Sequence, residues 1–266
     1  MCVIFRPRAR NVINDLVARG QYHFTSKDLR DALGVSNVAT RQALSRLAAK
    51  GEVASPARGF YVFVPPEYRR IGCLPADQFI PALMAERGTP YYVGLLSAAQ
   101  YHGAAHHRPQ EFQVVLAGNR PPIVCGSVRV TFVARKRMAD VAVDRLNNEH
   151  GTILVSSVEA TALDLVGYMH RSGGVDRVAG MLAELSEDLD PQKLCDASES
   201  ASILWSQRLG YLLDFVGAGD KAALLKDHVQ RNAKNYTKLL PYVNGSVVQR
   251  SKDWRLYANA TIEVEA

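Results

Sequence analysis

The chain has 266 residues, of which 47% are hydrophobic and 22% are charged, and this length exceeds one typical domain. No apolar run reaches the roughly 18 residues that a membrane span needs, and the apolar stretch before the first arginine is too short for a signal peptide. These features exclude a membrane-spanning class and predict a cytoplasmic protein with two or more domains.

The net charge of +6 is unevenly distributed along the chain. Residues 1–65 hold ten Lys/Arg and four Asp/Glu, whereas the remaining 201 residues hold 22 of each sign. A basic segment on an otherwise neutral chain is suited to neutralising nucleic-acid phosphates. A solvated basic surface with no partner would have the same composition, so charge alone does not decide between the two.

The basic segment contains three short helical patterns and a hairpin pattern. Apolar residues recur at helical spacing over 10–20, 24–34 and 36–51, and each stretch ends at a glycine. Loosely alternating apolar residues over 52–64 then predict two strands joined around an Arg-Gly. Three helices followed by such a hairpin indicate a winged helix-turn-helix domain over residues 1–65.

The outer side of the third predicted helix is polar, and the major groove of DNA accepts a helix of this kind. Arginine pairs with guanine, and glutamine or asparagine pairs with adenine. The candidate DNA-binding residues of this helix and its cap are Ser36, Asn37, Arg41, Gln42, Ser45 and Arg46. Ser26 and Lys27 begin the second helix, where a phosphate is favoured, and Arg58 lies at the hairpin tip, facing backbone or minor groove.

An amphipathic helix with an ordinary polar surface is the plainer alternative. Capping, apolar spacing, the hairpin and the charge all agree with one another, and this agreement favours DNA binding.

This helix resembles the recognition helix of GntR-family repressors, which carries a Ser-Arg-x-Thr-Val-Arg-Gln-Ala-Leu run. The residues that match are Ser36, Arg41, Gln42, Ala43 and Leu44. Asn37 stands where that family has arginine, and Ala39 stands where it has threonine. The resemblance covers only the first domain, and these two differences leave the preferred DNA sequence open.

The rest of the chain predicts a second, larger domain. Residues 66–75 are rich in proline and charge and predict a linker. Residues 76–266 predict a mixed, helix-rich domain with a sheet near 111–157, helices over 158–231 and terminal strands over 240–265. The fold class is therefore expected to be α+β.

No catalytic or metal-binding motif is evident. His102 and His106 have the spacing of zinc ligands on a helix, with His107 adjacent, but Gly103 interrupts that helix and no third ligand follows. The four cysteines, which we expect to be reduced and mostly buried, are Cys2, Cys73, Cys125 and Cys195. The sequence therefore predicts a protein that is not an enzyme and holds no metal or cofactor.

Two basic groups lie outside the first domain. Arg69 and Arg70 are in the predicted linker, and Arg135, Lys136 and Arg137 follow a predicted strand. Either group could serve solubility alone, or it could extend the DNA contact or bind a partner.

The order of motifs along the chain resembles that of AbiEi-type antitoxins. These motifs are "RGFYVFVP", "YYVGLLSAAQYHG", "ILVSSVEATALDLVGY" and "LCDASESASILWSQRLGYLLDFVG". The resemblance implies that the first domain binds inverted repeats in its own promoter and represses the operon. It also implies that the second domain counteracts a nucleotidyltransferase-like toxin, without an assured direct complex. Free-standing regulators occur in the family as well.

Two other functions remain open at this point. The second domain of a winged-helix regulator could sense a small metabolite, which a thermal-shift response would reveal. A DNA-processing enzyme could use the winged helix as a tether, but it would need an acidic or histidine cluster assembled by folding. The operator, the oligomeric state and the toxin are not specified by the sequence.

Overall fold

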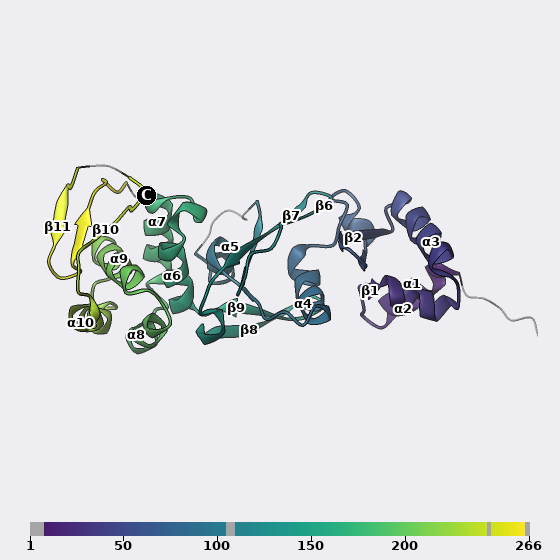
Figure 1. The fold of residues 1–266 in the computed structure, drawn as a ribbon, viewed down its shortest axis with the longest axis horizontal. Coiled ribbons are helices and arrows are strands. Elements are labelled where there is room, and N and C mark those ends of the chain that lie inside the picture. Colours follow the sequence, from purple (N-terminus) through teal and green to yellow (C-terminus); the bar gives the residue numbers. More distant parts are fainter. Residues whose placement is uncertain (1–7, 105–109, 244–245, 264–266) are drawn as a thin grey trace, which may run out of the picture.

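The structure is a computed structural model that describes residues 8–104, 110–243 and 246–263. The molecule is elongated, with a small winged unit at one end, a sheet and a helical layer in the middle, and a second small sheet at the other end (Figure 1). This mixed arrangement confirms the predicted fold class. No helix of the described ranges is long and apolar enough to cross a membrane.

The winged unit is built around a small apolar core. Its elements are α1 (Ala9–Ala18), β1 (His23–Thr25), α2 (Ser26–Leu33), α3 (Asn37–Ala49), β2 (Val53–Ala57) and β3 (Phe60–Phe63). β3 pairs with both β1 and β2, antiparallel in each case. Ile13, Leu29 and Leu44 are buried between the three helices and this sheet. The order of elements is the winged helix-turn-helix expected from the sequence.

The stretch expected to be a linker is packed rather than extended. It holds the short 3-10 helix η1 (Pro66–Tyr68), and both Cys73 and Leu74 have no exposed surface. Phe60 and Val62 of the wing share a hydrophobic core with these residues and with helix α4 (Ala76–Glu86). The winged unit therefore has a continuous apolar contact with the rest of the chain.

A second contact joins the same two units. The ring of Tyr22, just before β1, stacks on the imidazole of His150 with centroids 4.0 Å apart and planes 16° from parallel. His150 lies in the turn between strands β8 and β9 of the central sheet. Together with the shared core, this stack fixes the orientation of the winged unit.

The central sheet has six strands in the order β6-β7-β5-β4-β9-β8. Their bounds are Tyr92–Val93 (β4), Phe112–Leu116 (β5), Ile123–Cys125 (β6), Val128–Ala134 (β7), Val143–Asn148 (β8) and Gly151–Ser156 (β9). The pairs β5·β7 and β4·β9 are parallel, and the other pairs are antiparallel. Helix α5 (Leu95–Tyr101) packs against β5 and β9. The sheet extends beyond the predicted limits because β4, at residue 92, joins its two halves.

The helical layer forms the largest core of the molecule. It consists of α6 (Val158–Gly167), α7 (Val175–Leu185), α8 (Pro191–Glu199), α9 (Ile203–Phe215) and α10 (Ala223–Asn232), with 3-10 turns η2 (Met138–Asp140) and η3 (Met169–Arg171). α6 is buried along nearly its whole length, since it contacts α5, α7, α8 and α9. These helices agree closely with the predicted helical range.

A three-stranded sheet of order β10-β12-β11 covers the last helices. Its strands are Thr237–Lys238 (β10), Gln249–Ser251 (β11) and Leu256–Ala258 (β12), so it begins slightly before the predicted strands. Trp254 is buried against Gly210 of α9, where a Cβ atom would lie 2.0 Å from the indole ring. Only glycine allows this close packing of the sheet on α9.

Candidate nucleic-acid interface

Helix α3 lies in the winged unit, at the opposite end of the molecule from the terminal sheet (Figure 1), and its polar side is exposed. Ser36 caps the helix, because its Oγ accepts a hydrogen bond of 3.3 Å from the Ala39 N–H. Leu44 and Leu47 face inward. The exposed residues of this side are Asn37, Arg41, Gln42, Ser45 and Arg46. The structure thus gathers the predicted α3 residues on one accessible surface.

Four of these side chains are unengaged within the described ranges. The side chains of Arg41, Gln42, Ser45 and Arg46 form no hydrogen bond or ion pair with another described residue. Their donors and acceptors are therefore available to a base edge or a phosphate.

Asn37 is in a different situation from its neighbours. Its Oδ1 accepts a hydrogen bond of 3.2 Å from Nη1 of Arg30 at the end of α2, and Arg30 also pairs with Asp31 at 2.9 Å. A bidentate contact with adenine needs both the oxygen and the nitrogen of the amide. Arg30 occupies one of the two lone pairs of this oxygen and holds the amide in place, so Arg30 is a residue of this surface that sequence reasoning missed.

Val38 is a second residue that was missed. Its side chain is 62% exposed although it is apolar, and it lies one turn before Gln42 on the same side of α3. The signal in the sequence was an apolar residue in the first turn of α3, out of register with the inward-facing leucines.

The start of α2 lies beside the tip of the wing. The Ser26 N–H donates a hydrogen bond of 3.0 Å to the Gly59 carbonyl oxygen, and Thr25 forms a reciprocal capping box with Asp28. These contacts occupy the Thr25 and Ser26 N–H groups, and Lys27 beside them is exposed. Arg58, in the wing turn, is exposed as well.

The wing turn is tight and internally braced. The Ser55 hydroxyl lies 3.0 Å from the Ala57 carbonyl oxygen and 3.1 Å from that of Phe60, and Gly59 has a φ of +79°. The hairpin turn is therefore short and hydrogen-bonded, and it holds the backbone of Arg58 in place next to α2.

The two secondary basic groups differ in exposure. Arg69, Arg70 and Lys136 are exposed, and the Arg137 guanidinium bonds to Asp140 at 3.0 Å and to the Glu199 carbonyl oxygen at 2.8 Å. Arg135 is only 5% exposed, so the expectation that it contacts DNA or a partner is wrong.

Arg135 instead belongs to a buried polar cluster. It forms an ion pair with Asp164, which has no exposed surface, and the Tyr92 hydroxyl donates to Asp164 Oδ2 at 2.8 Å. The Arg135 guanidinium also lies 5.4 Å from the centroid of the Trp205 indole. Burial raises the pKa of Asp164 to about 6, and the nearby Arg135 partly opposes this shift. The cluster joins β4, the residue that follows β7, and α6, and its Tyr92, Arg135 and Asp164 side chains are all buried.

In the part of the chain that the structure describes, no group of three or more His, Cys, Asp or Glu side chains is arranged so that it could hold a metal ion. The His102 Nε2 lies 2.7 Å from the Ser156 carbonyl oxygen, as an ordinary helix-end histidine. His106, His107 and Cys2 lie outside the described residues. Cys73 and Cys125 are buried thiols, and Cys195 is half-buried.

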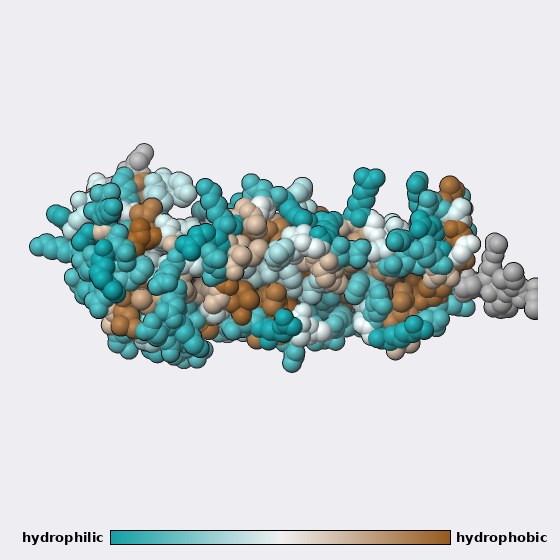
Figure 2. All heavy atoms as spheres, turned by 60° about the horizontal axis from the view of Figure 1, so that its bottom comes forward, coloured by the Kyte–Doolittle hydropathy of each residue, from teal (hydrophilic) through white to brown (hydrophobic). Residues whose placement is uncertain are grey.

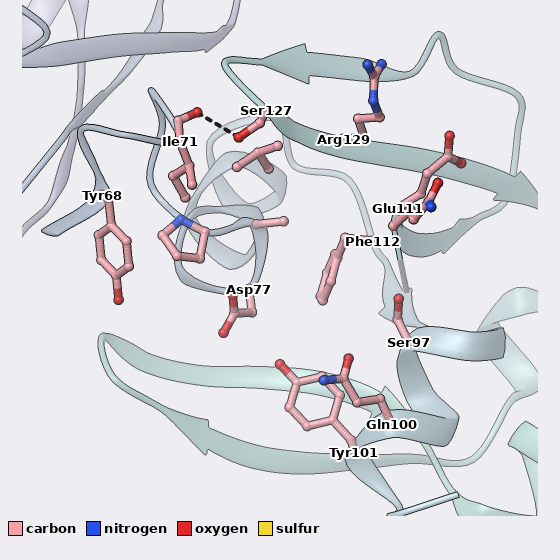
Figure 3. A pocket seen from close by; sticks show the side chains of 14 residues that line it. Tyr68, Ile71, Asp77, Ser97, Gln100, Tyr101, Glu111, Phe112, Ser127 and Arg129 are labelled. Carbon is pink, nitrogen blue, oxygen red and sulfur yellow. Dashed lines mark hydrogen bonds between the residues drawn. The ribbon is translucent and has the colours of Figure 1, made fainter. Parts of the chain in front are cut away.

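A groove of about 730 Å³ lies between residues 66–75, called the connector from here on, and the central sheet (Figure 3). Tyr68 of η1, Asp77 of α4, Tyr101 of α5, Phe112 of β5 and Arg129 beside it on β7 surround this space. Its lining mixes aromatic rings with both signs of charge.

A winged helix with an exposed, cationic recognition helix defines a DNA-binding transcription regulator. Residues 11–64 match the family described as "Transcriptional regulator, AbiEi antitoxin", and residues 92–215 match the "AbiEi antitoxin C-terminal domain". The chain belongs to the AbiEi antitoxin family, which confirms the resemblance seen in the sequence. Both descriptions are of antitoxins and regulators of toxin–antitoxin systems rather than of enzymes.

A solved structure shares the fold. The crystal structure of the RV2827C protein from Mycobacterium tuberculosis aligns with a TM-score of 0.67 at 18% identity, over 93% of this chain and 90% of that one. No curated protein matches the chain. The similarity to RV2827C supports the whole arrangement, from the winged unit to the terminal sheet.

Proposed function

We propose that this protein binds inverted repeats in its own promoter, represses the operon, and opposes a nucleotidyltransferase-like toxin encoded beside it. The observation that carries the DNA-binding part is the exposed side of α3, where Arg41, Gln42 and Arg46 are unengaged among the described residues. The excess of six positive charges in residues 1–65 gives this end a general attraction to phosphate.

Each exposed group has a distinct role in this proposal. Arg41 contacts guanine and Gln42 contacts adenine in the major groove, since both are long enough to pair in bidentate fashion. Val38 meets a thymine methyl group, because an exposed apolar side chain at the start of a recognition helix matches that feature of the groove. Lys27 and Arg58 contact phosphates on either side of the groove that α3 enters, and these contacts set the position of the protein along the DNA.

The experiment is a titration of the full chain with its own upstream DNA. We expect the labelled promoter fragment to bind at least 10³-fold more tightly than a shuffled fragment of equal length at physiological salt. A footprint should cover two inverted half-sites. Equal affinity for the two fragments would refute sequence-specific repression.

The antitoxin role is assigned to the region beyond the winged unit, which is supported by the family match over residues 92–215. Deleting residues 1–65 would strip Phe60 and Val62 from the shared core, so a point variant is the better test. A full chain with Arg41→Ala and Gln42→Ala should lose repression and still restore growth when the neighbouring toxin is expressed. Loss of both activities in a folded variant would contradict the division of roles.

A regulator that responds to a small molecule is the second candidate, favoured by the groove beside the connector. A ligand there would touch Tyr68 of η1, the first element after strand β3 of the wing. Thermal shift against a metabolite panel tests this idea, with Phe112→Ala as the variant that should abolish any shift. If no metabolite of the panel changes the melting temperature, the small-molecule candidate is rejected and the antitoxin proposal is the one that remains.

A further inference from the structure

The near-neutral charge of residues 66–266 conceals a strongly basic end. Residues 231–258 hold six Lys/Arg and one Asp, a net charge of +5. The single acid, Asp253, is already paired with Lys226 of α10. The positive charge of this segment is therefore not balanced by acidic residues of the segment itself.

The terminal sheet arranges part of this charge in a row. Tyr257, in the central strand β12, lies opposite Lys238 of β10 on one side and opposite Arg250 of β11 on the other. Its neighbours Leu256 and Ala258 are buried, so Tyr257 points to the outer face. Residues directly opposite in paired strands share a face, and Lys238, Tyr257 and Arg250 therefore cross the outer face together.

An aromatic stack accompanies this row. The ring of Tyr236 stacks on that of Tyr257 with centroids 4.9 Å apart and planes 30° from parallel. The Arg250 guanidinium lies 4.4 Å from the Tyr236 centroid and 5.9 Å from that of Tyr257. Arg250 is exposed and both tyrosines are half-buried, so a planar ligand can reach this stack when the guanidinium moves.

The cations around the stack have no acidic partner among the described residues. Lys234, Lys238, Arg250 and Lys252 are exposed and form no ion pair with them. Hydrophilic residues also dominate the visible surface at this end of the molecule (Figure 2). The face therefore combines unpaired positive charge with flat aromatic surface.

Unpaired cations next to aromatic rings on an exposed sheet are the chemistry that binds single-stranded nucleic acid. We propose that the outer face of the terminal sheet is a second nucleic-acid site, which takes a single strand. Bases stack on Tyr236 and on the Arg250 plane, and Lys238 and Lys252 contact the phosphates. A duplex fits less well, because its bases are already stacked on one another and do not expose their flat faces.

This site is independent of the proposed operator contact. The terminal sheet lies at the opposite end of the molecule from α3 (Figure 1). One chain can therefore hold a duplex at one end and a single strand at the other, and variants at the two ends should not affect one another.

The test is fluorescence anisotropy of the full chain with labelled 15-nucleotide oligouridylate and oligothymidylate. Lys238→Ala with Arg250→Ala should weaken binding at least 10-fold and lower the slope of log affinity against log salt by about 0.7, the value for the one phosphate contact that is lost with Lys238. Tyr236→Leu keeps the charge and should weaken binding by about 5-fold to 150-fold through the lost stacking. Circular dichroism and melting curves confirm that each variant is folded.

Two controls separate this site from the winged unit. Arg87→Ala with Arg145→Ala removes two exposed cations elsewhere and should leave single-strand binding unchanged. Lys27→Ala with Arg41→Ala should abolish promoter binding and spare single-strand binding, so failure of the promoter proposal does not imply failure here.

Three results would overturn the inference. The first is unchanged single-strand affinity in the Lys238/Arg250 variant. The second is a Tyr236→Leu protein that binds like the wild type, which would leave only unspecific charge attraction. The third is an unrelated 15-base-pair duplex that competes as well as the single strand in the Lys27/Arg41 background.

Discussion

Removing Arg135 and removing Asp164 from their buried ion pair should lower the stability of the protein in different ways. Arg135 is 5% exposed and Asp164 is not exposed at all, so removing either partner leaves an uncompensated buried group. Breaking such a pair costs about 3–5 kcal/mol. Asp164→Asn leaves a buried guanidinium without its partner, and this group cannot lose its proton. Arg135→Met leaves a buried carboxyl without its partner, and this group can gain a proton.

The two variants should therefore differ in their response to pH. Burial already raises the pKa of Asp164 from 3.8 to about 6, and losing Arg135 raises it further because the opposing cation is gone. A folded pKa above the unfolded one means that the native state binds the proton more tightly. Its stabilising effect is present at low pH and is lost as pH rises through the folded pKa.

At pH 8 the wild-type carboxyl is ionised and at pH 6 it is about half protonated, which changes wild-type stability by only about 0.4 kcal/mol. Over the same window the deficit of Arg135→Met should shrink by up to about 1.4 kcal/mol per pH unit. The deficit of Asp164→Asn should change by no more than about 0.4 kcal/mol. Urea unfolding at both pH values measures this, followed by tryptophan fluorescence, since Trp205 lies over Arg135. An Arg135→Met deficit that is equal at pH 6 and pH 8 would refute the reasoning.

Three further predictions concern the DNA-binding surface. Arg41→Ala or Gln42→Ala should cost about 1–3 kcal/mol of affinity on the promoter and little on random DNA, and equal losses in anisotropy titrations would remove the base-reading role. Lys27→Ala should weaken both DNAs alike and reduce the salt slope by about 0.9, so an unchanged slope would argue against a phosphate contact. Deoxyuridine in place of the contacted thymine should cost the wild type about 0.8 kcal/mol and should cost Val38→Ala clearly less; the same penalty for both proteins would exclude the methyl contact.

The winged unit was predictable because its signals are local. Thr25 and Ser36 cap the helices that follow them, and Gly34 ends α2 in a left-handed conformation. The apolar spacing between these caps then fixes which side of α3 faces solvent. Residues within one turn of each other determined most of the surface that we assign to DNA.

The central sheet was harder to predict because its strands depend on distant partners. β4 has only two residues, Tyr92 and Val93, and gains its place by pairing with β5 and β9. β8 (Val143–Asn148) has no buried residue, since it lies at the edge of the sheet. Such strands have too weak a local pattern to be seen without the rest of the fold.

The basic residues show the same limit in another form. Arg135 looked like its exposed neighbours Lys136 and Arg137, but its partners Tyr92 and Asp164 lie 43 and 29 residues away. The charged row on the terminal sheet was not visible in the net charge of residues 66–266, because acidic residues elsewhere in that range balance it. Composition measures totals, and only the pairing of strands shows where the charges meet.

The stacked rings of Tyr22 and His150 have a consequence for how two copies share one promoter. Because the winged unit is clamped to the central sheet, each bound molecule projects from the double helix as a stiff arm whose direction is set by the groove. Inserting half a helical turn, about 5 base pairs, between two half-sites would rotate one arm to the opposite side of the duplex, while a full turn of about 10 would return it. Any cooperation between neighbouring molecules should therefore rise and fall with the phase of the spacing rather than with its length.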